Sequence, residues 1–376
     1  MTLDRYVAWR YLKAWALTLG GFFVLATLIG LVEQVDRFGD DAEGFGAVVA
    51  LALLDAPGVL YPILPLVTVV AAIALFLALA RSSELAVTRA AGRSGLRLLL
   101  GPACVTVLLG ALAVALLNPI VAATSREYDA RVGRLDGRPS ALAVSDDGLW
   151  LGQAGLGGPG GGVGGGLGAA GPTIIRAERF NPDGTELRGV TFLSYDASGR
   201  PATRIEAAVA RLGEGGWTLT DAKSWPLGAP NPEAAATVEA SAFVPSTLTP
   251  DQIRDSFGSP SSVPIWELPR FIGRLEAAGF AARRHRVFLQ AELAQPAFLL
   301  AMMLVAAGFT MRHQRGRRVG MMVLAAILTG FAAYALRNLA QVMGEAGQVP
   351  PALAAWAPPL AAIACALGLL LHLEDG

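Results

Sequence analysis

Three histidines and two cysteines are the side chains in this sequence that could bind a metal or act as nucleophiles. His285, His313 and His372 are far apart, and no HExxH or CxxC spacing occurs, which argues against a zinc or iron site. Cys104 and Cys365 each lie in an apolar stretch and are interpreted as small buried residues, not as a disulfide pair. The sequence therefore predicts no catalytic residue and no metal site.

A short charged loop, residues 81–93, is the remaining candidate for a functional contact. In its sequence RSSELAVTRAAGR, Ser82 or Ser83 can cap a helix, Glu84 lies in the first turn and Gly92 can end it. We expect a short helix here. It is either a docking site for a partner protein or a basic connector between two apolar stretches.

The composition indicates the class of protein and therefore the kind of elements that hold this loop. Only 16% of the 376 residues are charged and 53% are apolar, whereas a soluble domain carries about 25% charge. The 30 basic residues balance the 30 acidic ones without forming a basic cluster, which argues against nucleic-acid binding. The chain is therefore predicted to be a membrane protein.

Six stretches without Asp, Glu, Lys or Arg are long enough to cross a membrane, which takes about 20 apolar helical residues. They are residues 14–32, 56–80, 98–125, 293–311, 319–336 and 346–373. The first is interpreted as an uncleaved helix because it is too long for a signal peptide and no small-x-small cleavage site follows before Glu33.

Basic residues are concentrated in the loops on one side of these spans. They are Arg5, Arg10, Lys13, Arg81, Arg89, Arg93, Arg97, Arg312, Arg315, Arg317 and Arg318. Because Lys and Arg are retained on the cytoplasmic side, both termini are predicted to be cytoplasmic. The long segment between the third and fourth spans is then predicted to be periplasmic or extracellular.

This middle segment, residues 127–285, has the pattern of a β-domain. Strand-like pieces at 189–195, 205–211, 217–223 and 235–244 alternate with turn residues, which is typical of a sandwich or jelly roll. The predicted fold is an α-helical membrane protein with six transmembrane helices, in two sets of three, and an inserted periplasmic β-jellyroll-like domain. The helical parts are residues 1–126 and 286–376.

Two further segments of the middle part have distinctive sequences. Residues 155–171 are rich in glycine and are interpreted as a flexible insertion, because a phosphate loop ends in GK[ST] and no Lys is present. Residues 264–278 predict an amphipathic helix that packs the β-domain onto the membrane helices or, alternatively, binds a partner. Its apolar positions are Ile265, Leu268, Phe271, Ile272 and Leu275.

The predicted spans contain no Asp, Glu, Lys or Arg in their interiors. Ion-coupled transporters usually need such groups near the middle of the membrane, and a hydrolase would need a base beside its nucleophile. Energy, if it is used, must therefore enter from a partner, and the loop at residues 81–93 is the expected place.

Several short motifs resemble a known family. They are Leu3-Asp4-Arg5-Tyr6, Val35-Asp36, Arg81-Ser-Ser-Glu-Leu85, Ala90-Ala-Gly92 and the ending Leu371-His-Leu-Glu-Asp-Gly376. Together with the order of three helices, β-domain and three helices, they resemble the LptF/LptG permeases of lipopolysaccharide export, and the LptG branch more than the LptF branch. The resemblance covers nearly the whole chain.

The resemblance implies a subunit of an ABC transporter in the inner membrane of a Gram-negative bacterium. An LptF-like permease would complete a heterodimer, driven by an LptB-like ATPase dimer that binds ATP and Mg. Lipopolysaccharide would be extracted from the inner membrane and passed to LptC-like and LptA-like periplasmic proteins. This chain would bind no cofactor and would not be an enzyme, in agreement with its lack of a Walker motif.

The resemblance also implies roles for particular residues. Residues 82–92 would form a coupling helix that docks in a groove of the ATPase. The residues expected to carry that contact are Arg81, Ser83, Glu84, Leu85, Val87 and Arg89.

Phosphates on the lipid headgroup would need cations near the outer membrane boundary. Arg37, Arg126 and Arg131 follow the first and third spans, and Arg126 is similar to a basic family position. An equal alternative is that these arginines extend to ordinary headgroups. The acyl chains would need an apolar cavity, which the first and fifth spans could line.

The sequence departs from the family pattern at the outer end of the first span. A family lysine aligns with Glu33, and a following lysine pair falls near Asp40 and Asp41. Either the lipid headgroup differs, or divalent cations bridge these three carboxylates to the phosphates.

Two other functions remain as alternatives to lipopolysaccharide export. A non-transporting envelope scaffold would present the β-domain to a partner and would bind no ATPase. A lipoprotein-release permease would also be ABC-driven, but it resembles a four-span layout and is disfavoured by the six predicted spans.

Overall fold

The computed structural model describes most of the chain. The described residues are 2–38, 44–84, 87–88, 94–135, 142–145, 148–153, 173–180, 185–196, 200–213, 215–246, 260–277, 282–311 and 319–375. They divide into two compact units. The helical unit comprises Met1–Tyr128, Ser261–Pro269 and Arg283–Gly376, and the second unit comprises Asp129–Pro260 and Arg270–Ala282.

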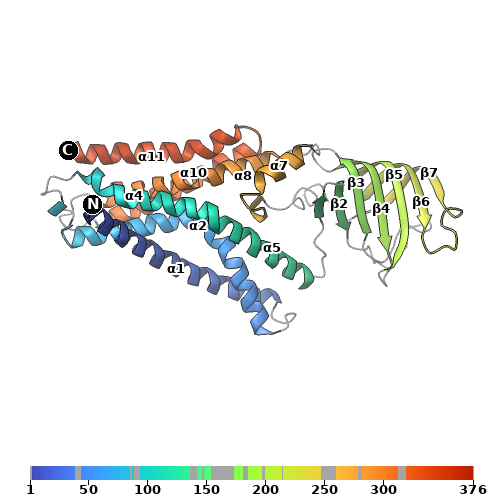
Figure 1. The fold of residues 1–376 in the computed structure, drawn as a ribbon, viewed down its shortest axis with the longest axis horizontal. Helices are drawn as coiled ribbons and strands as arrows, with labels where there is room; N and C mark the ends of the chain where they lie inside the picture. Colours follow the sequence, from blue (N-terminus) through green and yellow to red (C-terminus); the bar gives the residue numbers. More distant parts are fainter. Residues whose placement is uncertain are drawn as a thin grey trace. The chain divides into compact units, whose positions relative to one another are not determined.

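Long helices build the first unit (Figure 1). They are α1 (Thr2–Phe38), α2 (Phe45–Arg81), α4 (Gly95–Leu112), the π-helix η1 (Ala113–Leu117), α5 (Asn118–Leu135), α8 (Arg283–Leu293), α9 (Gln295–Thr310), α10 (Val319–Glu345) and α11 (Pro351–Asp375). The part of α5 from Asp129 onward belongs to the second unit. Within the described residues, five helical segments are long and apolar enough to cross a membrane, or six if α8 and α9 form one bent span. The predicted fold class, with an inserted β-domain, is confirmed.

The fourth predicted span, residues 293–311, contains the apolar α9, which is joined to α8 by a 50° bend. If α8 and α9 form one broken span, that span begins at Arg283. The break falls at Ala294, two residues before Pro296. Proline has no N–H to donate to the preceding turn and its ring crowds that turn, which explains the bend. Glu292, which bounds the predicted span, is buried in α8 directly before the bend.

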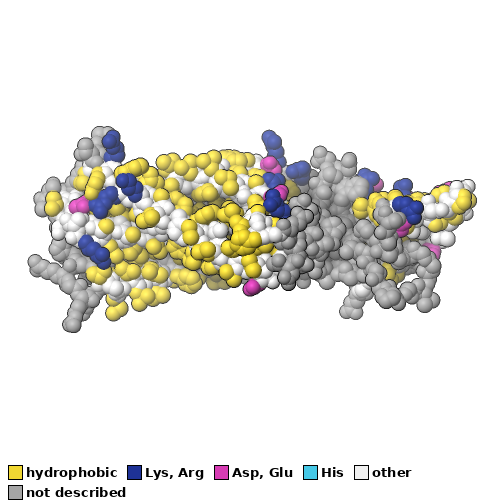
Figure 2. Space-filling view, turned by 90° about the horizontal axis from the view of Figure 1, so that it is seen from below, with side chains coloured by type: hydrophobic (Ala, Val, Ile, Leu, Met, Phe, Trp, Pro, Cys, Tyr) yellow, Lys and Arg dark blue, Asp and Glu magenta, His cyan; other side chains and the backbone are white. Residues whose placement is uncertain are grey.

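The core of the helical unit is formed largely by α9, whose side chains are mostly buried, and by the buried side chains of α2. In contrast, α1 and α10 expose apolar side chains along much of their length. Figure 2 shows a broad apolar surface over the helices, with Lys and Arg gathered towards its ends. A surface of this kind is favourable against lipid or another apolar partner and unfavourable in water.

Close contacts at small residues hold the helices together. A Cβ added to Gly110 of α4 would lie 2.5 Å from Pro296 Cα, and one added to Gly330 of α10 would lie 3.0 Å from Val69 of α2. Small residues allow such close backbone approach, which gives the packing attraction on which membrane helices depend.

Seven strands form an antiparallel sheet in the second unit, each paired with the next along the chain. They are β1 (Leu142–Ser145), β2 (Gly148–Gln153), β3 (Thr173–Phe180), β4 (Glu186–Tyr195), β5 (Pro201–Gly213), β6 (Gly216–Pro226) and β7 (Thr237–Pro245). The four strand-like pieces read from the sequence fall in β4 to β7. Antiparallel neighbours can be joined directly by a turn or loop without a crossover connection, which fits this consecutive order.

Alternating side chains of these strands form the core of the sheet. Phe192 of β4 and Trp217 of β6 are fully buried, and their rings meet edge to face with centroids 6.4 Å apart. Aromatic pairs of this geometry add attraction beyond the area they bury. The alternation follows from the period of two along a strand.

The predicted amphipathic helix is present as α7 (Leu268–Ala277) and begins four residues later than expected. Leu268, Ile272 and Leu275 are buried, and Phe271 is half-buried. The turn before it, with Ile265, is not helical, since Pro264 and its neighbours form hydrogen-bonded turns there. The glycine-rich segment at residues 155–171 lies outside the described residues, as do Arg312, Arg315, Arg317 and Arg318.

Candidate functional site

The loop after α2 holds the acidic residue that the sequence singled out. Arg81 is the last residue of α2, and Ser82 and Ser83 turn the chain. Ser83 has a φ of 58°, a left-handed conformation that non-glycine residues rarely adopt. Glu84, Val87 and Thr88 are helical, whereas Leu85 and Arg89 lie outside the described residues.

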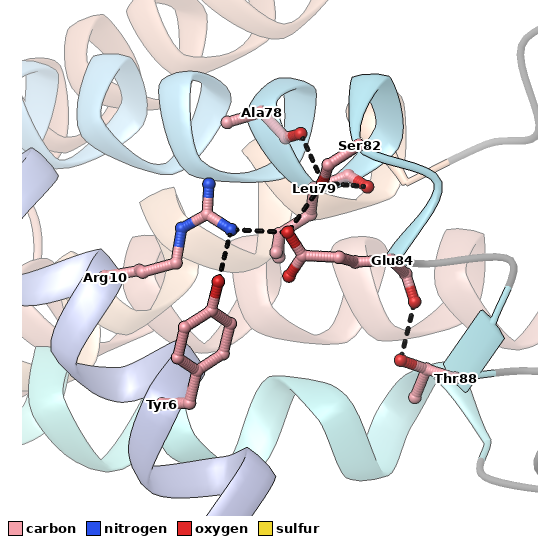
Figure 3. Close-up of polar contacts among 7 residues, drawn as sticks. All are labelled: Tyr6, Arg10, Ala78, Leu79, Ser82, Glu84 and Thr88. Carbon is pink, nitrogen blue, oxygen red and sulfur yellow. Dashed lines mark hydrogen bonds and ion pairs between the residues drawn. The ribbon is translucent and has the colours of Figure 1, made fainter.

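An arginine of α1 binds Glu84. Arg10 Nη1 donates a hydrogen bond to Glu84 Oε1 at 2.7 Å and another to Tyr6 Oη at 2.9 Å (Figure 3). The guanidinium also lies over the Tyr6 ring, 5.5 Å from its centroid. Ser82 Oγ lies 2.7 Å from the same carboxylate oxygen. The contact ties the loop after α2 to the beginning of α1.

The charge of Glu84 is set by these neighbours. Partial burial opposes ionisation, but the hydrogen bonds from Ser82 and Arg10 outweigh it, so the pKa of Glu84 lies below its usual value. The carboxylate is therefore ionised at neutral pH. Its side chain is 34% exposed, and Val87 on the same segment is 68% exposed. An anionic group beside an exposed apolar side chain can form a small contact with a partner.

The predicted headgroup residues are only partly brought together. Glu33, Asp36 and Arg37 share one groove along α1, and the Arg37 guanidinium lies over the Phe38 ring. Arg126 and Arg131 are both on α5 instead.

The contacts of the predicted headgroup residues do not test whether they bind a lipid headgroup, so that role stays a prediction. Arg126 is exposed, and its Nε donates to Ala122 O at 3.2 Å. Arg131 is half-buried in the second unit, and Asp40 and Asp41 lie outside the described residues.

An apolar groove of about 410 Å³ runs between α1, α2 and the third span. Its walls include Leu19 and Phe23 of α1, Leu60 and Leu64 of α2, and Ile120 of α5. The prediction from the sequence was that the first and fifth spans line such a cavity. In the structure this groove is instead lined by α1, α2, η1 and α5.

No group of three or more His, Cys, Asp or Glu side chains that could hold a metal ion is found in the part of the chain that the structure describes.

Comparison with known proteins connects this geometry to a family. Residues 5–372 match the model of the family described as lipopolysaccharide export system permease LptF/LptG. The chain belongs to this family. The protein named lipopolysaccharide export system permease protein LptG of Escherichia coli K12 is 24% identical over 378 residues, covering 98% of both chains. The corresponding protein of Escherichia coli O6:H1 strain CFT073 is equally similar.

Family membership confirms the resemblance that the terminal and loop motifs indicated. A member of the LptF/LptG family is a multi-pass inner-membrane permease of lipopolysaccharide export and part of an Lpt transporter. Membership also supports the role of a transporter subunit that does no catalysis itself.

In this family member the structure adds residues that the sequence did not single out. Arg10 is one, because its partner Glu84 is 74 positions away and no local pattern links them. A second group is buried among the helices. Tyr61 Oη of α2 donates a hydrogen bond to Glu292 Oε2 of α8, and Arg337 of α10 lies over the Phe298 ring, 4.8 Å from its centroid. A sequence signal for Glu292 and Arg337 was present, because each of these charges bounds an apolar stretch.

Proposed function

We propose that this chain is the LptG-type half of an ATP-driven exporter that extracts lipopolysaccharide from the inner membrane. An LptF-like permease completes the dimer, and an LptB-like ATPase dimer binds ATP and Mg. LptC-like and LptA-like proteins receive the lipid in the periplasm. The chain itself binds no cofactor.

The observation that carries this proposal is the contact between Arg10 and Glu84. It joins a loop with exposed Val87 to α1, and α1 forms one wall of the apolar groove. A push on the loop by a partner is therefore delivered to a helix that could hold acyl chains. Rigid helices with defined contacts are the usual carriers of such coupling.

The proposed orientation follows the distribution of basic residues. Both termini and the loop around Glu84 face the cytoplasm, and residues 127–285 form the periplasmic domain. Residues 1–126 and 286–376 supply the transmembrane helices. In this arrangement the ATPase meets residues 82–92, with Arg81, Ser83, Glu84, Leu85, Val87 and Arg89 at the contact.

The docking experiment compares Glu84→Arg with a matched change at another exposed acid. Glu345 ends α10, and its carboxylate lies 3.9 Å from Arg284 Nε. We expect the complex purified through Glu84→Arg to lose its ATPase subunit, while Glu345→Arg retains it. Retention in both variants contradicts the proposed docking site. A complex that never contains an ATPase supports the envelope scaffold instead.

The headgroup site is proposed at Arg37, Arg126 and Arg131. In the α1 groove, Glu33 and Asp36 outnumber Arg37, so an anionic phosphate is favoured there only if a divalent cation offsets the carboxylates. We therefore propose that a cation bridges Glu33, and with it Asp40 and Asp41, to the lipid phosphates.

The test of this bridge is the magnesium dependence of extraction in the reconstituted complex. Glu33→Lys supplies the positive charge directly and is expected to make extraction less dependent on Mg²⁺. Glu33→Gln removes charge without adding a cation and serves as the control. An unchanged Mg²⁺ dependence in both variants contradicts the bridge.

A further inference from the structure

A polar cavity of about 360 Å³ lies inside the helical unit, between α2, α5, α8 and α10. One carboxylate and one guanidinium line it: Glu292 is 4% exposed and Arg337 is 9% exposed. Both residues are described, and they form no direct ion pair within 4 Å of one another; Glu292 accepts from Tyr61 and Arg337 stacks on Phe298. Glu292 and Arg337 attract one another electrostatically, and Asn118 also hydrogen-bonds to Glu292, so the two buried charges are already partly compensated. A ligand that carries both signs of charge would pair each of them more closely.

A buried amide oxygen points to the same conclusion. Gln295 is 1% exposed and lines this cavity. Its Oε1 has no hydrogen-bond partner within the described part of the chain. An unpaired buried acceptor is costly, and a donor in the cavity would remove that cost. The Glu292 carboxylate is also an acceptor, so a ligand here is expected to carry N–H donors and a positive charge.

The wall formed by α10 presents hydrogen-bond donors and a positive charge, in contrast to the acceptors of Glu292 and Gln295. Arg337, Asn338 and Gln341 all line the cavity, and they bring a guanidinium and two side-chain amides. A guanidinium binds phosphate oxygens with two parallel hydrogen bonds, and amide N–H groups can add to them. This side of the cavity is suited to a phosphate.

The polar cavity adjoins the apolar groove. Tyr61 lines both, and the groove continues along α2 to Leu64 and along α1 from Phe23 to Trp15. Tyr61 presents its hydroxyl to Glu292, which leaves its ring for the groove. A polar chamber joined to an apolar channel matches the two halves of a lipid.

We propose that these cavities bind one phospholipid with an ethanolamine headgroup. Its ammonium group lies between Glu292 and Gln295, its phosphate meets Arg337, and an acyl chain follows the groove. One anion and one cation in the wall fit a zwitterionic headgroup, whereas a glycolipid with two phosphates would bring two anions to a single guanidinium. The site lies within one subunit and is independent of the coupling role of Glu84.

The experiment is native mass spectrometry of the intact membrane complex released from nanodiscs. Phosphatidylethanolamine, phosphatidylcholine and phosphatidylglycerol are supplied one at a time. The ethanolamine lipid is expected to bind about tenfold more tightly than the other two, because choline has no N–H donor and glycerol has no positive charge. Gln295→Leu is expected to remove this preference, and Gln348→Leu, at an exposed site, to keep it.

Equal binding of the three lipids overturns the proposal, as does an unchanged preference in Gln295→Leu. Displacement of the ethanolamine lipid by lipopolysaccharide also overturns it, since the cavity would then belong to the exported substrate. Arg337→Gln is expected to weaken binding of both phosphatidylethanolamine and phosphatidylglycerol. If that variant does not assemble, Gln295→Leu still decides, because it has a similar volume and changes no charge.

Discussion

Replacing Arg10 with glutamine tests the contact between α1 and the loop after α2. The ion pair is about one-third exposed on each side, at 29% and 34%, so solvent screens it and its contribution is about 0.5–1 kcal/mol. Such a loss lowers the population of the ordered loop by about two- to fivefold. The affinity of the complex for its ATPase subunit is expected to fall by the same factor in Arg10→Gln.

A double-mutant cycle gives the sharpest form of this test. The affinity of the ATPase subunit is measured for Arg10→Gln, Glu84→Gln and the double variant in nanodiscs. If Arg10 acts through Glu84, the double variant binds no more weakly than Glu84→Gln alone. Lys13→Gln, on the same helix, serves as the control for loss of a positive charge. Effects of Arg10→Gln and Glu84→Gln that simply add would refute the reasoning.

Three further predictions concern pH and packing. The pKa of Glu84 is lowered on folding, so the Arg10 contact adds stability above the ordinary pKa of Glu, and this stability is lost as pH falls through the lower folded pKa. An NMR titration of labelled Glu84 should show a midpoint below 4.5. A midpoint above 4.5 would contradict the stabilising contact. Gly110→Ala should destabilise the helical unit by about 1–3 kcal/mol, because the added Cβ would meet Pro296. Gly20→Ala is the control, since an added Cβ there would have nothing within 4 Å. Equal melting temperatures of the two variants would contradict the close packing at Gly110. Trp217→Ala should lower the free energy of unfolding of the sheet by about 3–5 kcal/mol. The expected readout is earlier proteolysis within residues 185–246. An unchanged cleavage pattern would show that the Trp217 side chain is not central to the core.

The order of elements could be predicted because its signals are local. Charge-free runs predict the membrane helices, and alternation near Ile205 and Val209 predicts a strand that the structure contains. The ends of elements were less predictable. A count of uncharged residues could not show that the helix bends before Pro296 or that α8, with Glu292, precedes this bend.

The candidate sites were predicted less completely for a different physical reason. Glu84 could be chosen from the sequence because an acid in a first helical turn is distinctive. Its partner Arg10, and the meeting of Tyr61, Glu292 and Arg337, depend on helices that are distant along the chain. Such groupings form only when the helices pack, so neither periodicity nor charge patterning reports them.

The most direct test of the proposed function is lipopolysaccharide extraction from proteoliposomes that contain the purified permease pair, with and without the ATPase subunit. Extraction is expected only when the ATPase and ATP are both present, and it should be abolished by Glu84→Arg while the permease pair stays assembled. Extraction by the permease pair alone, or at an undiminished rate in Glu84→Arg, would contradict the claim that work done by a partner enters through this loop.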